Sequence, residues 1–436
     1  MQSILYFICA VLLVLQLVLP KKYAMLPMAF AIFHVGGNLE VIGDFTVIRL
    51  LILVGVGRAI VSGSLRFSLS NPFDRIMAIL AAWLVISSIG HPDSLTNPYV
   101  YRLGLVWNYL GSYLYAKAYL PAFNRESLLR YCLLLSVFAI PFSAALLAEK
   151  KTQKNSYSML GARSATAGSR EGKVRAQGTF GHPILAGTVG ATTLPLAFFI
   201  FRRGRKKIGL LAIAACVAIV IASASSGPLA ALATTMLGIY AWRWQRHASF
   251  MIKAGLASLV FLQLVMTRDV WHLMSMMDLV GGSTGWHRAR LIDRAVEYLG
   301  DWWLFGTDYT RHWMATGVSW SPNHVDFTNH YIALGVVSGL PTVILFATLI
   351  TKSVRTALLA LRTWAPNSDE SYLIWCLLIS LSAHVISMFS IDYFDQNYVL
   401  MYSLFAIFSN AKEKLTNELN NGEPSMPIHE IGTRQN

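Results

Sequence analysis

The sequence predicts an all-α polytopic integral membrane protein. Three observations support this fold class. Of the 436 residues, 55% are hydrophobic and only 13% are charged, about half of the ~25% that is typical of a soluble domain. The mean hydropathy is +0.50. Apolar runs close to the length that crosses a bilayer as a helix recur from end to end. Together these features exclude an ordinary cytosolic enzyme, a disordered chain and a disulfide scaffold.

Thirteen apolar segments are candidate membrane spans. Two of them, 24–35 and 208–222, are short for a bilayer, so we expect 12 or 13 crossings. The first segment lacks a basic start and a small-x-small cleavage site, and we therefore expect a retained anchor rather than a signal peptide. All four cysteines lie inside apolar runs, where they are expected to pack as small apolar residues. The candidate spans are 3–19, 24–35, 45–61, 73–90, 100–120, 128–149, 183–201, 208–222, 226–242, 250–266, 329–351, 371–389 and 397–409.

Basic residues predict which side of the membrane each loop faces. The run from Arg202 to Lys207 should lie in the cytoplasm, since helical membrane proteins collect Lys and Arg there. If successive loops alternate between the two sides of the membrane, starting from this cytoplasmic run, 22 Lys and Arg residues lie inside. The short outer loops then hold one, Arg102. The formal net charge of +14 is therefore interpreted as a signal for the orientation of the chain in its membrane, and no nucleic-acid partner is expected.

This topology divides the chain into six parts. We expect transmembrane helices at 1–149, 183–266 and 329–410. Two long periplasmic loops, 150–182 and 267–328, separate them. The polar segment 411–436 is typical of a disordered cytoplasmic tail.

The first periplasmic loop is basic. Its second half, from Arg170 to Pro183, interleaves cations with small residues that let the backbone approach a ligand. Guanidinium groups bind phosphate oxygens through paired hydrogen bonds, so this loop is a candidate cradle for a diphosphate. A loop that contacts anionic lipid headgroups is the alternative.

The second periplasmic loop is aromatic. It holds six of the twelve tryptophans beside acidic and arginine side chains, a mixture that suits a sugar chain. An aromatic belt at the membrane interface, together with a small packed core, is the competing interpretation. Three tryptophans far from the span ends favour sugar contact and are candidate substrate-binding residues: Trp302, Trp303 and Trp313.

Within this loop, Arg288 to Leu299 is expected to form an amphipathic helix. Leu291, Ala295 and Leu299 recur every four residues on one face. Ser283 or Thr284 is expected to cap its start, and Gly300 to end it. Arg288 then lies in the first turn, where the helix dipole disfavours a cation. A cation at that position suggests a ligand.

Polar side chains cluster again at 321–331, where the next span begins. His324 and His330 are candidate general bases near neutral pH. A metal site is disfavoured because no cysteine and no third clustered ligand accompany the His-x-Asp pair. Helix capping by Asp326, Thr328 or Asn329 is the structural alternative.

These loops resemble the bacterial O-antigen ligase and polymerase superfamily. The resemblance covers roughly residues 170–345. It rests on Arg175-Ala-Gln-Gly-Thr-Phe-Gly-His-Pro183, on Ser223-Ala-Ser-Ser-Gly-Pro228, on Arg288-x-x-Leu291 with Leu304-Phe-Gly306, and on Thr328-Asn-His-Tyr331 before Gly335 and Gly339.

The resemblance implies a fold similar to C-type membrane glycosyltransferases. Such proteins transfer a glycan from undecaprenyl diphosphate to an acceptor hydroxyl on the periplasmic side, with no cofactor, nucleotide sugar or metal. Other polysaccharide assembly proteins are expected partners, together with membrane lipids. By resemblance, Arg288 would bind the diphosphate, with Arg175 as a second cation.

Two positions differ from the family's ligases. Ser226 stands where they carry an arginine, and Thr328 where they carry a histidine. His330, His324 or the carboxylate of Asp326 would then act as the base, and a polymerase-like member is favoured over a ligase. A transporter or flippase of lipid-linked oligosaccharides is the alternative from another class. It is disfavoured because we find no internal repeat and most charges within the spans lie toward their ends.

Overall fold

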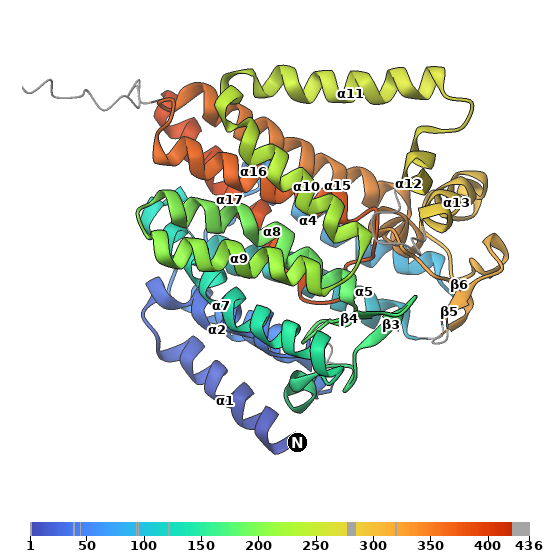
Figure 1. The fold of residues 1–436 in the computed structure, drawn as a ribbon, viewed down its shortest axis with the longest axis horizontal. Coiled ribbons are helices and arrows are strands. Elements are labelled where there is room, and N and C mark those ends of the chain that lie inside the picture. Colours follow the sequence, from blue (N-terminus) through green and yellow to red (C-terminus); the bar gives the residue numbers. More distant parts are fainter. Residues whose placement is uncertain are drawn as a thin grey trace, which may run out of the picture.

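The computed structural model describes residues 2–37, 40–43, 45–92, 94, 96–120, 123–276, 285–318 and 321–420. Its regular structure is almost entirely helical and forms a bundle of long helices (Figure 1). Three short antiparallel hairpins interrupt it. The all-α fold class is therefore confirmed.

The helices follow the predicted spans closely. In the first part of the chain they are α1 (Gln2–Val18), α2 (Met25–His34), α3 (Val47–Val61), α4 (Pro72–Ile86), α5 (Pro98–Val106), α6 (Ser112–Tyr119) and α7 (Arg125–Thr152). The central helices are α8 (Pro183–Arg202), α9 (Lys206–Ala222), α10 (Ser226–Tyr240), α11 (Ala248–Val265), α12 (Leu273–Met276), α13 (Gly285–Glu297) and α14 (Leu299–Trp302). The last are α15 (His330–Thr363), α16 (Asp369–Ser387) and α17 (Asn397–Asn420).

The hairpins lie in the segments between spans. They pair β1 (Glu40–Ile42) with β2 (Phe45–Thr46), β3 (Gly168–Arg170) with β4 (Lys173–Arg175), and β5 (Gly317–Val318) with β6 (Ser321–Val325). The second and third hairpins belong to the two long loops. They lie with α13 at one end of the bundle (Figure 1).

Six helical runs among the described residues are long and apolar enough to cross a membrane. Ser3–Val18 is a shorter apolar helix. The protein is therefore suited to a membrane by the length and composition of its helices. The six runs are Pro72–Gly90, Arg125–Thr152, Pro183–Arg202, Ser226–Val265, His330–Thr363 and Asp369–Ser387.

Two predicted boundaries need correction. The amphipathic helix α13 ends at Glu297, and Gly300 lies inside α14 instead of ending α13. The expected caps at 283 and 284 lie outside the described residues. Helix α17 runs to Asn420, because Ala411 and Leu415 are buried and keep this polar segment packed on the bundle. The predicted tail therefore starts too early at 411, and 421–436 lies outside the described residues.

Helix α15 is broken where the second long loop packs against it. Ser338 and Gly339 leave the helical conformation, with φ angles of −152° and +80°. A break frees backbone groups that need new partners within a membrane protein. The loop supplies them: the Thr307 amide donates to the Val336 carbonyl at 2.8 Å, and the Leu340 amide donates to the Trp303 carbonyl at 2.8 Å.

Glycines allow this close packing. A Cβ at Gly339 would lie 1.7 Å from the Leu304 carbonyl oxygen, and one at Gly335 would lie 2.4 Å from the Trp302 ring. Gly306, with φ +94°, would place a Cβ 2.2 Å from the Val336 oxygen. These glycines explain the motif at 304–306 and the glycines after 331 as a docking contact between loop and helix.

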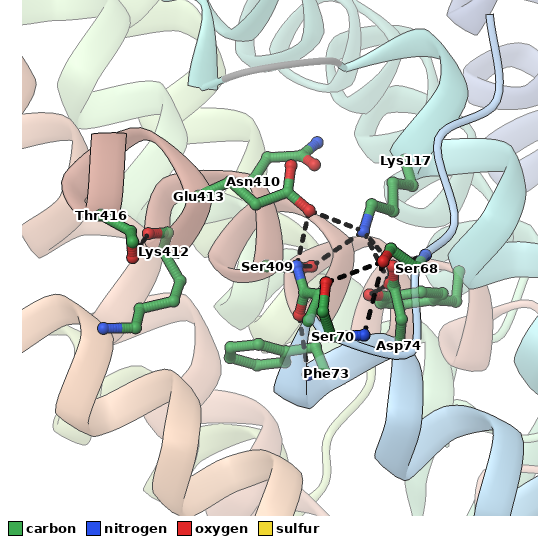
Figure 2. Close-up of polar contacts among 12 residues, drawn as sticks. Ser68, Ser70, Phe73, Asp74, Lys117, Ser409, Asn410, Lys412, Glu413 and Thr416 are labelled. Carbon is green, nitrogen blue, oxygen red and sulfur yellow. Dashed lines mark hydrogen bonds and ion pairs between the residues drawn. The ribbon is translucent and has the colours of Figure 1, made fainter. Parts of the chain in front are cut away.

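A largely buried ionic network joins helices α4, α6 and α17 (Figure 2). Lys117 Nζ of α6 lies 2.6 Å from both carboxylate oxygens of Asp74 in α4 and 3.1 Å from Glu413 Oε1 in α17. Asp74 is fully buried, and Lys117 is 3% exposed. The network ties three helices together at the end of α4 away from His91.

Candidate functional site

A cavity of about 1390 Å³ lies where the two long loops and the segments around 91–102 and 391–394 meet. Its wall is formed by parts of 91–102, 158–184, 286–288, 307–328 and 391–394. Four of the predicted site residues line it: Arg175, Arg288, His324 and Asp326. Segments far apart in the sequence, which the topology predicts to lie on one side of a membrane, thus form one site.

Arginines dominate one part of the wall. Arg163, Arg170 and Arg175 come from the first long loop, and Arg288 comes from α13. Arg288 is 7% exposed. Desolvation lowers its pKa from 12.5 to about 10, and the positive charges of Arg170 and Arg175 contribute. The pKa of Arg175 is likewise lowered to about 10, by desolvation and by Arg170.

The motif that begins at Arg175 is held by hydrogen bonds from neighbouring helices. Arg175 Nη2 donates to Ser225 Oγ at 2.8 Å, and the Ala176 amide donates to the Ala222 carbonyl at 3.1 Å. The first and middle motifs of the family resemblance therefore contact each other directly. Farther on, the Gly181 amide donates to Asp395 Oδ2 at 2.9 Å.

His182 lines the cavity near these arginines. Its Nδ1 accepts a hydrogen bond from the Ile184 amide at 3.1 Å and so caps α8. Desolvation lowers the pKa of His182 to about 3, and the nearby charges of Arg175, Arg170, Arg288 and Arg163 reinforce this direction. His182 is therefore neutral at physiological pH and adds no charge to the arginines.

Histidines and carboxylates line another part of the cavity. His91 Nδ1 lies 2.5 Å from Asp308 Oδ1, and its Nε2 lies 2.9 Å from the Phe305 carbonyl oxygen. His324 Nδ1 lies 2.8 Å from Ser321 Oγ. Desolvation lowers the pKa of His324, so its imidazole is neutral at pH 7 and is able to accept a proton.

The carboxylate of Asp326 interacts electrostatically with the guanidinium of Arg288. Its negative charge favours the charged guanidinium, against the desolvation that lowers the pKa of Arg288. The main-chain oxygen of Asp326 lies 3.4 Å from His287 Nε2. Within the described part of the chain, however, no ion pair joins Arg175 or Arg288 to a carboxylate.

Some of the buried polar atoms without a partner belong to the wall of this cavity. Among the described residues, five such atoms belong to side chains of its wall. An unsatisfied buried polar group costs free energy, and a cluster of them in a cavity indicates a polar ligand. They are Arg102 Nε, Arg175 Nε, Arg288 Nε, Asp308 Oδ2 and Thr328 Oγ1.

His330 is placed differently from the prediction. It is 2% exposed and does not line the cavity. Its Nδ1 instead lies 2.7 Å from Asp392 Oδ1, and Asp392 does line the cavity. The predicted capping at this point is confirmed for Asn329, whose side chain accepts from the Tyr331 and Ile332 amides.

The three predicted sugar-binding tryptophans do not line the cavity. Trp302 and Trp313 are buried in the core of the second long loop, beside Leu291 and Ala295 of α13. Trp303 is exposed by 53% at the surface. For the two buried rings the packed-core interpretation applies, because a loop of this length needs its own apolar core. Trp286 and Phe327 are the aromatic residues of the loop that reach the cavity.

Sequence reasoning missed three residues of the wall. Asp308 follows the motif at 304–306 by two residues, and this spacing was an available signal. His91 and Asp392 lie in short loops between spans, with no local pattern around them. Their place in the site follows from contacts with distant segments, Asp308 and His330 respectively.

Among the described residues, no group of three or more His, Cys, Asp or Glu side chains could hold a metal ion. No protein-family model matches the chain, and neither a curated protein nor a solved structure matches it.

Proposed function

We propose that this protein is a membrane glycosyltransferase that uses polyprenyl-diphosphate-linked glycans, and that it polymerises an O-antigen or exopolysaccharide. One observation carries the proposal. The cavity holds two desolvated arginines, Arg175 and Arg288, without carboxylate ion pairs among the described residues, together with the neutral base His324. Fixed cations beside a base are what the departure of a diphosphate from a sugar requires.

The charge pattern supports a site on the periplasmic side. The segments that line the cavity are those that alternation of 12 or 13 spans would place outside. The Lys117–Asp74–Glu413 network joins segments that the same alternation would place in the cytoplasm. A substrate in the outer leaflet of the inner membrane would then present its diphosphate at the level of the arginines.

The reaction would proceed by displacement at the anomeric carbon. The acceptor hydroxyl oxygen forms a bond to this carbon while the bond to the diphosphate oxygen breaks. The acceptor proton passes to His324, or to the Asp326 carboxylate. The electron pair of the broken bond stays on the leaving polyprenyl diphosphate, whose charge Arg288 and Arg175 neutralise. His330 would act through Asp392 and would position that carboxylate.

The direct test uses reconstituted protein. The full-length chain is placed in liposomes with undecaprenyl-diphosphate oligosaccharide as the sole glycan, and products are separated by size on a gel. A ladder of products is expected from the wild type and from Lys151→Ala, an exposed cation outside the cavity. Arg288→Ala should give no ladder while it inserts normally. A ladder from Arg288→Ala would contradict the proposal.

The acceptor distinguishes the neighbouring activities. No ladder from the wild type, but transfer to an added lipid A core sugar, would identify a ligase. Movement of the lipid between leaflets without a new glycosidic bond would identify a flippase. His324→Ala and Asp326→Asn, assayed side by side with His330→Ala, identify the base, since His330→Ala should retain partial activity.

A further inference from the structure

A second surface on α13 faces away from the cavity. Trp286, Arg290, Asp293, Arg294 and Glu297 follow each other at helical spacing and line an open groove of about 360 Å³ together with Arg268. On a helical wheel this stripe lies opposite Arg288, which enters the cavity. Except at Trp286, which lines both, the two surfaces are therefore separated by the width of one helix, about 10 Å.

The acidic groups of this groove have polar partners of their own. Asp293 accepts a hydrogen bond from Trp271 Nε1 at 2.7 Å and lies 3.1 Å from His272 Nε2. Glu297 pairs with Arg294. Arg268 and Arg290 are exposed, and neither makes an ion pair with a carboxylate of the described residues. The groove thus presents two available guanidinium groups to an anion.

An apolar helix that is suited to a membrane span leads into this groove. Apart from Lys253 and Gln263, helix α11 carries mostly apolar or small side chains, and Ala248 is its one buried residue in the described part of the chain. Phe261 is 63% exposed and Leu264 is 80% exposed. Figure 1 shows α11 along the edge of the molecule, joined to the remainder at its two ends. Its last residue, Val265, is three positions before Arg268.

We propose that α11 and the α13 groove bind a second polyprenyl diphosphate, which carries the acceptor glycan. This inference rests on the proposed function, since a polymerase joins two lipid-linked glycans and each carries a diphosphate. The apolar helix, about 27 Å long at 1.5 Å per residue, would pack against the polyprenyl chain. Arg268 and Arg290 would bind its diphosphate.

Trp286 connects the two surfaces. Its side chain lines both the cavity and the groove, and it is 56% exposed. An indole ring at this point can pack against a sugar ring of the acceptor as that sugar passes from the groove to the cavity. As a membrane span, α11 would have its apolar surface covered by the bilayer, so the two arginines at its end are the feature that indicates an amphiphile with an anionic headgroup.

The test counts bound lipids on the full-length protein. Native mass spectrometry is done from phosphatidylcholine nanodiscs that contain undecaprenyl diphosphate. Two bound polyprenyl diphosphates are expected for the wild type and for Lys253→Ala, a control cation on the other end of α11. One is expected for Arg268→Ala/Arg290→Ala, and one for Arg288→Ala.

The outcomes separate this inference from the proposed function. Two lipids on Arg268→Ala/Arg290→Ala, or one on the wild type, would overturn the second site. Loss of the second lipid when phosphatidylglycerol is added in excess would overturn it too, because the groove would then bind any anionic lipid. Two lipids on Arg288→Ala would instead contradict the donor site of the proposed function.

Discussion

Replacement of Arg288 by methionine should stabilise the empty protein while it abolishes transfer. Methionine keeps much of the length and apolar stem of the arginine and removes its charge. Arg288 is 7% exposed and has no ion-pair partner among the described residues, and Arg170 and Arg175 repel it. The charged guanidinium therefore lowers the stability of the fold in the absence of a ligand.

The magnitude follows from the pKa. A pKa lowered from 12.5 to about 10 makes the charged form about 3 kcal/mol less favourable in the folded state, at about 1.4 kcal/mol per pH unit. The charge of Arg288 lowers the free energy of unfolding. A guanidinium whose pKa falls on folding is charged in both states at pH 7, and the charged form is more stable in the unfolded chain. Some van der Waals contact is lost with the guanidinium, so we expect Arg288→Met to gain about 1–3 kcal/mol.

The assay is thermal unfolding in detergent at pH 7, followed by tryptophan fluorescence. Arg288→Met should unfold at a higher temperature than the wild type, and Lys151→Met, an exposed control, should not differ. Added undecaprenyl diphosphate should stabilise the wild type more than Arg288→Met, which keeps only the proposed groove beside α11 as a binding site. A lower unfolding temperature for Arg288→Met without ligand would refute the reasoning, since the guanidinium would then serve the fold.

Three further predictions concern stability. The wild-type protein should lose stability as the pH falls from 6.5 to 4, because His182 has a pKa of about 3 in the folded state and takes up a proton at higher pH in the unfolded chain. His182→Asn should reduce this loss, and thermal unfolding at several pH values checks it. Lys117→Met should cost about 3–5 kcal/mol by leaving Asp74 buried and unpaired, and a double-mutant cycle with Asp74→Asn should show strong coupling. Gly306→Ala should lower the unfolding temperature and the transfer rate together, because its Cβ would collide with the Val336 carbonyl.

The helices were predictable because each is encoded locally. Apolar periodicity and flanking polar residues lie within a short window, and each of the thirteen predicted spans corresponds to a helix or, at 100–120, to α5 and α6 joined by the π-helical turn Trp107–Gly111. The break in α15 was not predicted as a break. It depends on Gly339 together with Leu304, residues 35 positions apart in the sequence, whose contact no local window contains.

The site was predictable in its charges and less so in its geometry. Arg175, Arg288, His324 and Asp326 stood out because cations and titratable groups are rare in so apolar a chain, and they line one cavity. The role of the tryptophans could not be assigned from the sequence, for a physical reason. An indole that packs a small core and an indole that binds a sugar have the same sequence signal, and the difference is whether apolar neighbours such as Leu291 cover the ring.

The cavity also bears on Ser226 and Thr328, the two positions at which the sequence differs from the ligase pattern used for the predicted resemblance. Ser226 does not line the cavity, and Arg163 and Arg170 of the first long loop supply extra positive charge beside Arg175. Thr328 does line it, as does His324, four residues earlier. A cation and an imidazole need only lie near the reacting atoms, and their position in the sequence is immaterial to the chemistry. A transferase that obtained both groups from neighbouring segments would keep the reaction while its motifs changed, which supports the polymerase proposal despite the two substitutions.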